Sequence, residues 1–176
     1  HTALFKILAG EMEPDEGTVK WGQTATFSYF PKDNNEFFEG HEENMLDWIA
    51  PYSRTDTLES TLRGFLGRML FSGDDVYKPV RVLSGGEKVR LMLARMMLFG
   101  SNVLVIDQPT NHLDLESITA VNNGVRDFKG TVLFASHDHE FVQTIATRII
   151  EIREKGVLDK ECTYDEFLEF RETYKG

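Results

Sequence analysis

The chain has 176 residues, of which 41% are hydrophobic, so it is long enough to form one substantial domain with a hydrophobic core. Its 19 basic and 29 acidic residues give a net charge of -10, which excludes a surface that grips nucleic-acid phosphates by itself. Cys162 is the only cysteine, and no apolar run has the length of a membrane helix or the pattern of a secretion signal. We therefore expect a single domain, 1–176, that lies in the cytoplasm and has no membrane partner.

The first half of the chain indicates helices and little regular β-structure. Residues 2–8 look like a helix interior with no strand or cap before it, so the chain is expected to begin inside a fold. Alternating polar residues over 17–29 predict a small antiparallel hairpin. Residues 42–82 favour a helical insert, with Asp56 and Glu59 available as its N-terminal cap. Apolar residues recur in this insert at helical spacing, at Leu58, Leu62, Phe65, Leu66, Met69 and Leu70.

Short apolar runs alternate with helical patterns in the second half, which favours an α/β fold with a mostly parallel sheet. Buried strands are predicted at three such runs, residues 102–107, 131–135 and 147–152. A helix is predicted over 114–127, although Asn122-Asn123-Gly124 is a poor helix former. Thr163 and Glu166 form a capping-box pattern that predicts a helix near the end of the chain.

A glycine-rich helix start follows the insert. Ser84 and Glu87 have the spacing of a capping box, and Gly85 and Gly86 lie between them. This pattern is compatible with an ordinary helix N-terminus. It is equally compatible with a phosphate site, because such an N-terminus presents free N–H groups and the positive end of the helix dipole to an anion.

Two polar residues follow neighbouring predicted strands. Asp107 ends the first buried strand, where ligands of open α/β sheets bind and where a carboxylate can hold Mg²⁺ beside phosphates. Taken alone, this residue could equally cap the next turn. His137 follows the next strand and should lie at the same edge of the sheet, although a single histidine after a strand is more often a loop residue. The glycine-rich helix start, Asp107 and His137, in this order along the chain, together favour a nucleotide site.

Together these segments resemble the motifs of ATP-binding cassette (ABC) ATPases. Residues 83–87 resemble the signature motif, 103–107 the Walker B strand, 111–114 the D-loop, and His137 the switch histidine. The resemblance implies an α/β, P-loop NTPase-like core with a mostly parallel sheet, a small antiparallel β part and a helical subdomain over 42–100. It covers nearly the whole chain.

The residues of two motifs are similar to those of the ABC-F class in particular. Leu-Ser-Gly-Gly-Glu-Lys and Pro-Thr-Asn-His-Leu-Asp are typical of that class. Residues 29–34 are similar to the Q-loop region of second, C-terminal cassettes, as in YbiT-like and YkpA-like members. ABC-F proteins act on the ribosome, so the resemblance implies ribosome or rRNA contacts through the parent protein.

The resemblance also implies roles for particular residues. In the family, two cassettes face each other head to tail, and ATP lies between the Walker motifs of one and the signature of the other. The signature residues Ser84, Gly85, Gly86 and Glu87 would serve the nucleotide of the opposing cassette. Thr2 and Asp107 would hold Mg²⁺ on this chain's own ATP, His137 would contact the γ-phosphate, and Asp114 would couple the two sites.

Three positions depart from the family pattern. His1 stands where a Walker A lysine is expected, and the glycine loop before it is absent, which suggests truncation. Gln108 stands where the family has the catalytic glutamate; an amide cannot accept a proton, so hydrolysis should be impaired by about 10²- to 10⁴-fold. This amide fits either a deliberate substitution that traps the ATP-bound state or a naturally degenerate site. Lys32 replaces the usual Q-loop glutamine and could offer a cation to the phosphates.

Three functions remain open at this point. The leading one is an ABC-F cassette whose ATP-driven closure acts on the ribosome. The second is the ATP-hydrolysing subunit of a membrane transporter, for which the shared fold is the only support. A groove for a membrane partner in residues 42–82 would favour the transporter. The third is a nucleotide-dependent interaction module without catalysis, which Gln108 allows.

Overall fold

A three-stranded parallel sheet forms the centre of the computed structural model, which describes residues 1–174. Its strands are β1 (Phe27–Phe30), β2 (Val103–Asp107) and β3 (Thr131–Ala135), in the order β1-β2-β3. All five residues of β2 are buried, whereas β3 is only partly covered. The strands predicted at 102–107 and 131–135 are therefore confirmed, and so is their parallel pairing.

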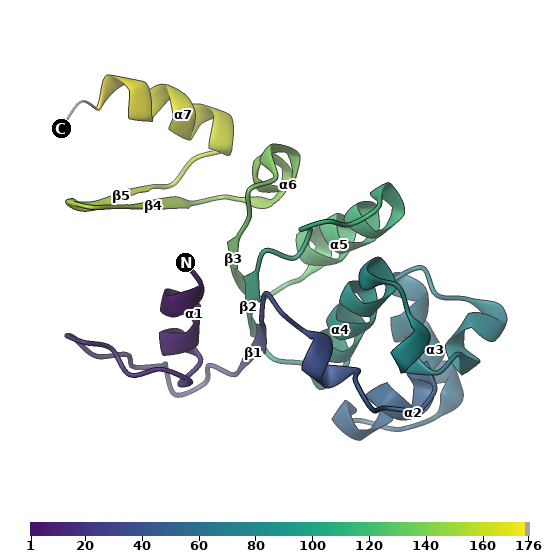
Figure 1. The fold of residues 1–176 in the computed structure, drawn as a ribbon. Coiled ribbons are helices and arrows are strands. Elements are labelled where there is room, and N and C mark those ends of the chain that lie inside the picture. The colour runs from purple at the N-terminus through teal and green to yellow at the C-terminus, as the bar shows by residue number, and fades with distance from the viewer. Residues whose placement is uncertain (175–176) are drawn as a thin grey trace.

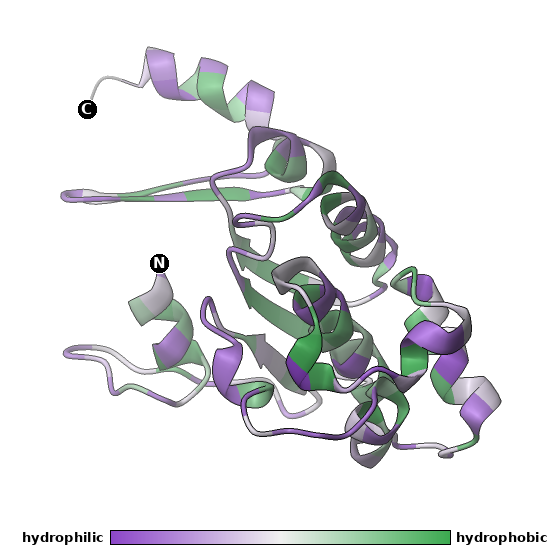
Figure 2. Ribbon diagram, turned by 45° about the vertical axis from the view of Figure 1, so that its right-hand side comes forward, coloured by the Kyte–Doolittle hydropathy of each residue, from purple (hydrophilic) through white to green (hydrophobic). Residues whose placement is uncertain are grey.

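Helices cover both faces of this sheet (Figure 1). Helix α1 (Thr2–Leu8) packs on one face, where its Phe5 joins Val103 and Val105 of β2. Helices α4 (Gly85–Phe99) and α5 (Leu115–Asp127) lie on the other face. Successive residues of a strand point to opposite faces, so Leu104 and Ile106 belong to this second, larger core. Apolar colour accordingly concentrates on the strands (Figure 2).

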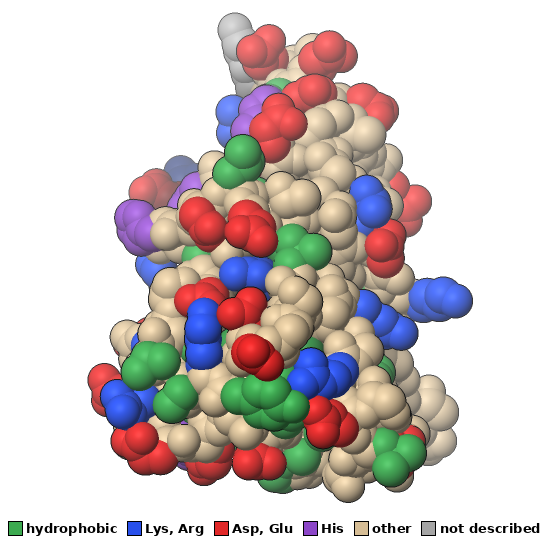
Figure 3. Space-filling view, turned by 90° about the vertical axis from the view of Figure 1, so that its right-hand side faces the viewer, with side chains coloured by type: hydrophobic (Ala, Val, Ile, Leu, Met, Phe, Trp, Pro, Cys, Tyr) green, Lys and Arg blue, Asp and Glu red, His purple; other side chains and the backbone are tan. Residues whose placement is uncertain are grey.

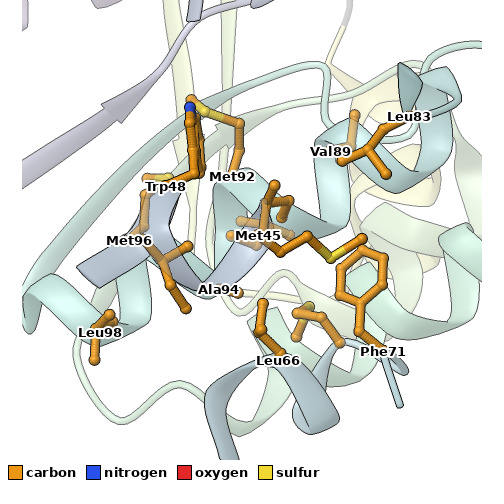
Figure 4. Close-up of a cluster of buried hydrophobic side chains, with 14 of the residues drawn as sticks. Met45, Trp48, Leu66, Phe71, Leu83, Val89, Met92, Ala94, Met96 and Leu98 are labelled. Atoms are coloured by element: carbon orange, nitrogen blue, oxygen red, sulfur yellow. The ribbon is translucent and has the colours of Figure 1, made fainter. Parts of the chain in front are cut away.

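A helical region packs against the far side of α4. It contains α2 (Met45–Ile49) and α3 (Glu59–Arg68), joined by short 3₁₀ turns. Its core is a dense apolar cluster in which Met45 and Phe71 lie side by side (Figure 4). Among the described residues, no helix is long and apolar enough to cross a membrane.

The predicted insert helix ends earlier than its apolar spacing suggested. Leu70 lies outside α3, has a left-handed backbone (φ 67°) and is 48% exposed, so its assignment to the helix was wrong. The carbonyl of Leu66 accepts hydrogen bonds from both Met69 N and Phe71 N, which turns the chain and buries Phe71 instead. The predicted cap was also wrong, because Leu58 occupies the cap position.

The antiparallel hairpin predicted over 17–29 was wrong. Only β1 is a strand in this segment, and it pairs in parallel with β2. The polar alternation has another cause: the Thr24 carbonyl accepts a hydrogen bond from Asn102 Nδ2, and the Thr26 hydroxyl accepts one from Asn102 N. Trp21 stacks on Phe27 and donates to a carbonyl of α1, so the segment is held by side chains.

The strand predicted at 147–152 exists, but it is not buried. It forms β4 (Ile149–Arg153), which pairs antiparallel with β5 (Gly156–Lys160) in a separate two-stranded sheet. Only two residues separate β4 from β5, so the pair must be antiparallel. Helix α7 (Tyr164–Thr173) packs on one face of this hairpin through Phe167, while Ile150 and Ile152 stay about half exposed on the other. The small antiparallel part of the fold is therefore here.

Both predicted capping boxes are present. Ser84 and Glu87 cap α4, and Thr163 and Glu166 cap α7. Helix α5 forms despite its weak central sequence, because Gly124 allows the methyl groups of Met69 and Met97 to pack against the helix backbone. Helix α6 (His139–Ile145) follows β3 after residues 136–138, and the Asp138 carboxylate caps it.

Two glycines should respond to alanine in opposite directions. A Cβ at Gly130, just before β3, would overlap the Asn102 carbonyl and lie 2.6 Å from Phe128 Cε1. We expect Gly130→Ala to lower the free energy of unfolding by about 1–3 kcal/mol. Gly64 in α3 faces open space, so Gly64→Ala should raise it by about 0.5–1 kcal/mol. Urea titration of both variants checks this; equal effects would contradict the packing described at Gly130.

Candidate nucleotide site

The carboxyl end of β2 carries a buried carboxylate with one free oxygen. Asp107 is completely buried, and its Oδ2 accepts a 2.6 Å hydrogen bond from the hydroxyl of Thr2 at the start of α1. Its other oxygen, Oδ1, is buried and has no partner. Because a buried unpaired carboxylate oxygen is costly, this atom marks a place where a cation or a donor fits.

A large cleft opens beside this pair. It has a volume of about 760 Å³, and Thr2, Lys6, Tyr29, Lys32 and Asn111 are among the residues that line it. Lys32 is exposed and lines the same cleft as Thr2. Burial, and then the charge of Asp107, raise the pKa of Tyr29, whose hydroxyl group is buried without a partner.

Gln108 and His137 meet at the next position along the sheet edge. Their Nε2 atoms are 3.3 Å apart. An amide nitrogen can only donate, so in this contact His137 Nε2 is the acceptor. The two residues line a small cleft of about 120 Å³ together with Thr110 and His112.

The loop after β2 is held in an unusual conformation. Gln108 and His112 both have left-handed backbones, with φ of 50° and 58°. Gln108 N donates to the carbonyl of Ala135 on β3 at 2.8 Å, which fixes the loop to the neighbouring strand. This bond closes the last β2–β3 pair, Asp107 with Ala135, and the Gln108 side chain then meets His137.

The signature residues lie apart from this group. Ser84 and Gly85 are exposed, Gly86 is buried, and Glu87 completes the capping box at the start of α4. None of them lines either cleft described above. The predicted site residues therefore form two groups, one at the edge of the sheet and one at the N-terminus of α4.

Asp114 belongs to the second group. A Cβ at Gly86 would lie 2.7 Å from Asp114 Oδ1 and would overlap the Ser117 hydroxyl, so the start of α5 packs tightly on the start of α4. The Ser117 hydroxyl holds the pKa of Asp114 below its usual range, and the charge of Arg90 acts in the same direction. The carboxylate is therefore ionised at neutral pH.

Sequence reasoning did not single out Tyr29 or Arg90 as site residues. Tyr29 could have been found from its place near the end of a strand, had β1 been assigned correctly. Arg90 gave no signal beyond its position on an apolar helix face. The His1 side chain is exposed and forms no cap hydrogen bond at the start of α1.

Comparison with known proteins agrees with this arrangement. A family model described as "ABC transporter" matches residues 1–111. The "Uncharacterized ABC transporter ATP-binding protein YkpA" of Bacillus subtilis is 63% identical over 174 residues, which are 99% of this chain and 32% of that protein. The "Energy-dependent translational throttle protein EttA" of Escherichia coli K12 is 32% identical over 99% of this chain and 32% of its own length.

A solved structure with a similar fold is described as "Model of ribosome-bound archaeal Pelota and ABCE1". It is 25% identical, with a TM-score of 0.73, over 96% of this chain and 30% of that one. The chain spans about a third of the curated relatives it matches. The match to the family model and the relatedness to YkpA and EttA show that the chain belongs to the ATP-binding cassette family, and within it to the ABC-F proteins.

Proposed function

We propose that the chain is the C-terminal cassette of a ribosome-associated ABC-F protein, where it binds ATP with Mg²⁺ and closes against a second cassette. The observation that carries this proposal is the row of groups at one sheet edge: Thr2 bonded to Asp107, followed by Gln108 bonded to His137. The carboxyl ends of β2 and β3 and the start of α1 bring these groups together, at the position where α/β proteins bind ligands.

The residues of this edge fit a magnesium ion. Mg²⁺ prefers oxygen ligands and is commonly held by one or two carboxylates together with substrate phosphates. The unpaired Asp107 Oδ1 and the adjacent Thr2 hydroxyl supply such oxygens, so these two residues would hold the ion. When bound, it would neutralise phosphate charge. Lys32 would bring a further cation to the phosphates from the cleft wall.

Gln108 is proposed to make hydrolysis slow. In the structure its amide donates to His137 Nε2, so it acts as a donor where a general base would have to accept a proton. His137, whose Nε2 is occupied by this bond, would need to change its partner before it could donate to a γ-phosphate. The ATP-bound state should therefore be long-lived.

The second group of residues is proposed to serve the opposing cassette. Ser84 and Gly85 lie exposed at the N-terminus of α4, a 15-residue helix whose dipole and free N–H groups favour an anion. Glu87 closes the capping box and keeps the Ser84 backbone in place. Asp114 lies directly beside this N-terminus and would carry the coupling between the two nucleotide sites.

Ribosome action is proposed from the relatives. EttA is named a translational throttle, and the ABCE1 structure is ribosome-bound. The chain itself is acidic, and one face of it mixes acidic and basic side chains without a continuous basic patch (Figure 3). Contacts with rRNA would therefore come mainly from other parts of the full-length protein, which would act in the cytoplasm.

A transporter subunit is the second candidate. The observation that favours it is a cleft of about 240 Å³ in the helical region, lined by Phe37, Trp48 and Tyr52 among others, which a helix end of a membrane partner could enter. The ABC-F relationship favours the ribosome instead.

Restoring a carboxylate at position 108 should restore turnover. We expect Gln108→Glu in the full-length protein to raise the ATP hydrolysis rate by about 10²- to 10⁴-fold, because a carboxylate can accept the proton of the attacking water. ATP-dependent co-sedimentation with ribosomes should be stronger for the unchanged protein. Gln143→Glu, the same change on α6 away from the cleft, is the control and should alter neither.

Turnover that stays absent in Gln108→Glu would refute the role assigned to this position. Ribosome binding that ignores nucleotide in both forms would instead favour the transporter subunit or an interaction module.

Asp107 should account for the magnesium dependence of nucleotide binding. We expect Asp107→Asn to weaken ATP binding in Mg²⁺ by at least about tenfold, and to change it little in EDTA, because only the ion contact is lost. Thr2→Ala should act in the same direction. Asp33→Asn removes the same charge from the cleft wall without touching Thr2, and serves as the control. Equal losses for Asp107→Asn and Asp33→Asn in fluorescence titrations would show a general charge effect and reject the ion site.

A further inference from the structure

Arg90 on α4 is a buried cation with no carboxylate partner. It is 7% exposed, and within residues 1–174 it forms no ion pair with an acidic side chain. Its guanidinium lies over the ring of Phe71, 4.6 Å from the centroid, and one terminal nitrogen donates to the Met69 carbonyl at 3.0 Å. Its Nε is buried without any partner. A buried charge without a carboxylate partner is costly to the fold, because it has lost its hydration.

One end of the Arg90 contacts is the close of α3. Met69 follows the last residue of this helix, and Leu70 then takes its left-handed turn. Carbonyl groups at the end of a helix have no intrahelical partner, so the guanidinium satisfies one of them. Phe71, which stacks on Arg90, is anchored in the apolar cluster of the helical region. A movement of the helical region would therefore change the contacts of Arg90.

The start of α4, one turn before Arg90, packs on the D-loop aspartate Asp114. Gly86 lies one helical turn before Arg90 on the same face of α4, and it is the residue whose Cβ would meet Asp114 and Ser117. Arg90 is also the basic side chain whose charge contributes to the lowered pKa of Asp114. One face of α4 therefore carries both contacts, that of Arg90 with the end of α3 and that of Gly86 with Asp114 and Ser117 at the start of α5.

We infer that Arg90 is a positioning residue that keeps the signature turn, the D-loop aspartate Asp114 and the end of α3 in one fixed arrangement. This inference rests on the proposed function, in which Ser84 serves the opposing nucleotide and Asp114 couples the two sites. With Arg90 in place, a shift of the helical region would move Ser84 and Asp114 together. Lysine could keep the charge but not the flat stack on Phe71 together with a directed hydrogen bond; methionine could keep the volume alone.

A double-mutant cycle in the full-length protein tests this. Arg90→Met, Asp114→Asn and the double variant are compared by the ATP concentration that half-saturates cassette closure, measured by energy transfer between dyes on the two cassettes. We expect the combined effect to differ from the product of the single effects by about fivefold. Arg95→Met is the matched control. Arg95 lies on the same helix as Arg90 and also stacks on aromatic rings, those of Trp48 and Tyr52, so its variant should combine with Asp114→Asn multiplicatively.

A second measurement does not depend on ATP. Hydrogen exchange of the amides at the start of α5 should accelerate in Arg90→Met, partly recover in Arg90→Lys, and stay unchanged in Arg95→Met. Faster local exchange together with coupled closure supports the inference. If exchange at α5 is faster in Arg90→Met but Asp114→Asn does not change the ATP dependence of closure, the positioning by Arg90 is supported and the proposed function of Asp114 is refuted. Unchanged exchange at α5 in Arg90→Met would overturn the inference. So would closure that Asp114→Asn does change, if the Arg90→Met and Asp114→Asn effects combine multiplicatively.

Discussion

Complete burial of β2 is the constraint on which the rest of this cassette depends. A strand covered on both faces must be apolar along its length, and a charged residue is tolerated only where the strand ends. Asp107 occupies that end, and Thr2 satisfies one of its oxygens from α1. Because β1 and β3 run parallel to β2, the residues that follow all three strands gather at this edge. The position of the site is thus a consequence of how the sheet is packed.

Much of this could be predicted from local signals in the sequence. β2, β3, α5 and both capping boxes were found because their patterns depend on neighbouring residues alone. The meeting of Asp107, Gln108 and His137 could be anticipated from the rule that ligands bind at the carboxyl ends of parallel strands. For the ends of β2 and β3, the order of residues was therefore enough.

The errors share a physical origin in long-range contacts. Thr24 and Thr26 alternate like strand residues, but Asn102, more than 70 positions away, uses their oxygen atoms. Leu70 fits the helical period of α3, yet burial of Phe71 turns the chain before it. Ile150 and Ile152 look like core residues, but only the opposite face of their hairpin is covered by α7. Arg90 could not be identified as important at all, because its partners Met69 and Phe71 lie far from it in the sequence.

The left-handed backbones of Gln108 and His112 have a further consequence for how this loop can evolve. A non-glycine residue in that conformation costs about 1–2 kcal/mol. Glycine would remove the cost at either position, but it would also widen the range of shapes that the loop samples. The left-handed residues of the loop between β2 and α5 therefore lower the stability of the fold and keep the loop rigid. Variants with a more heat-stable loop should hold the Gln108 side chain in a less defined position. Selection for thermal stability therefore works against a fixed position of this side chain.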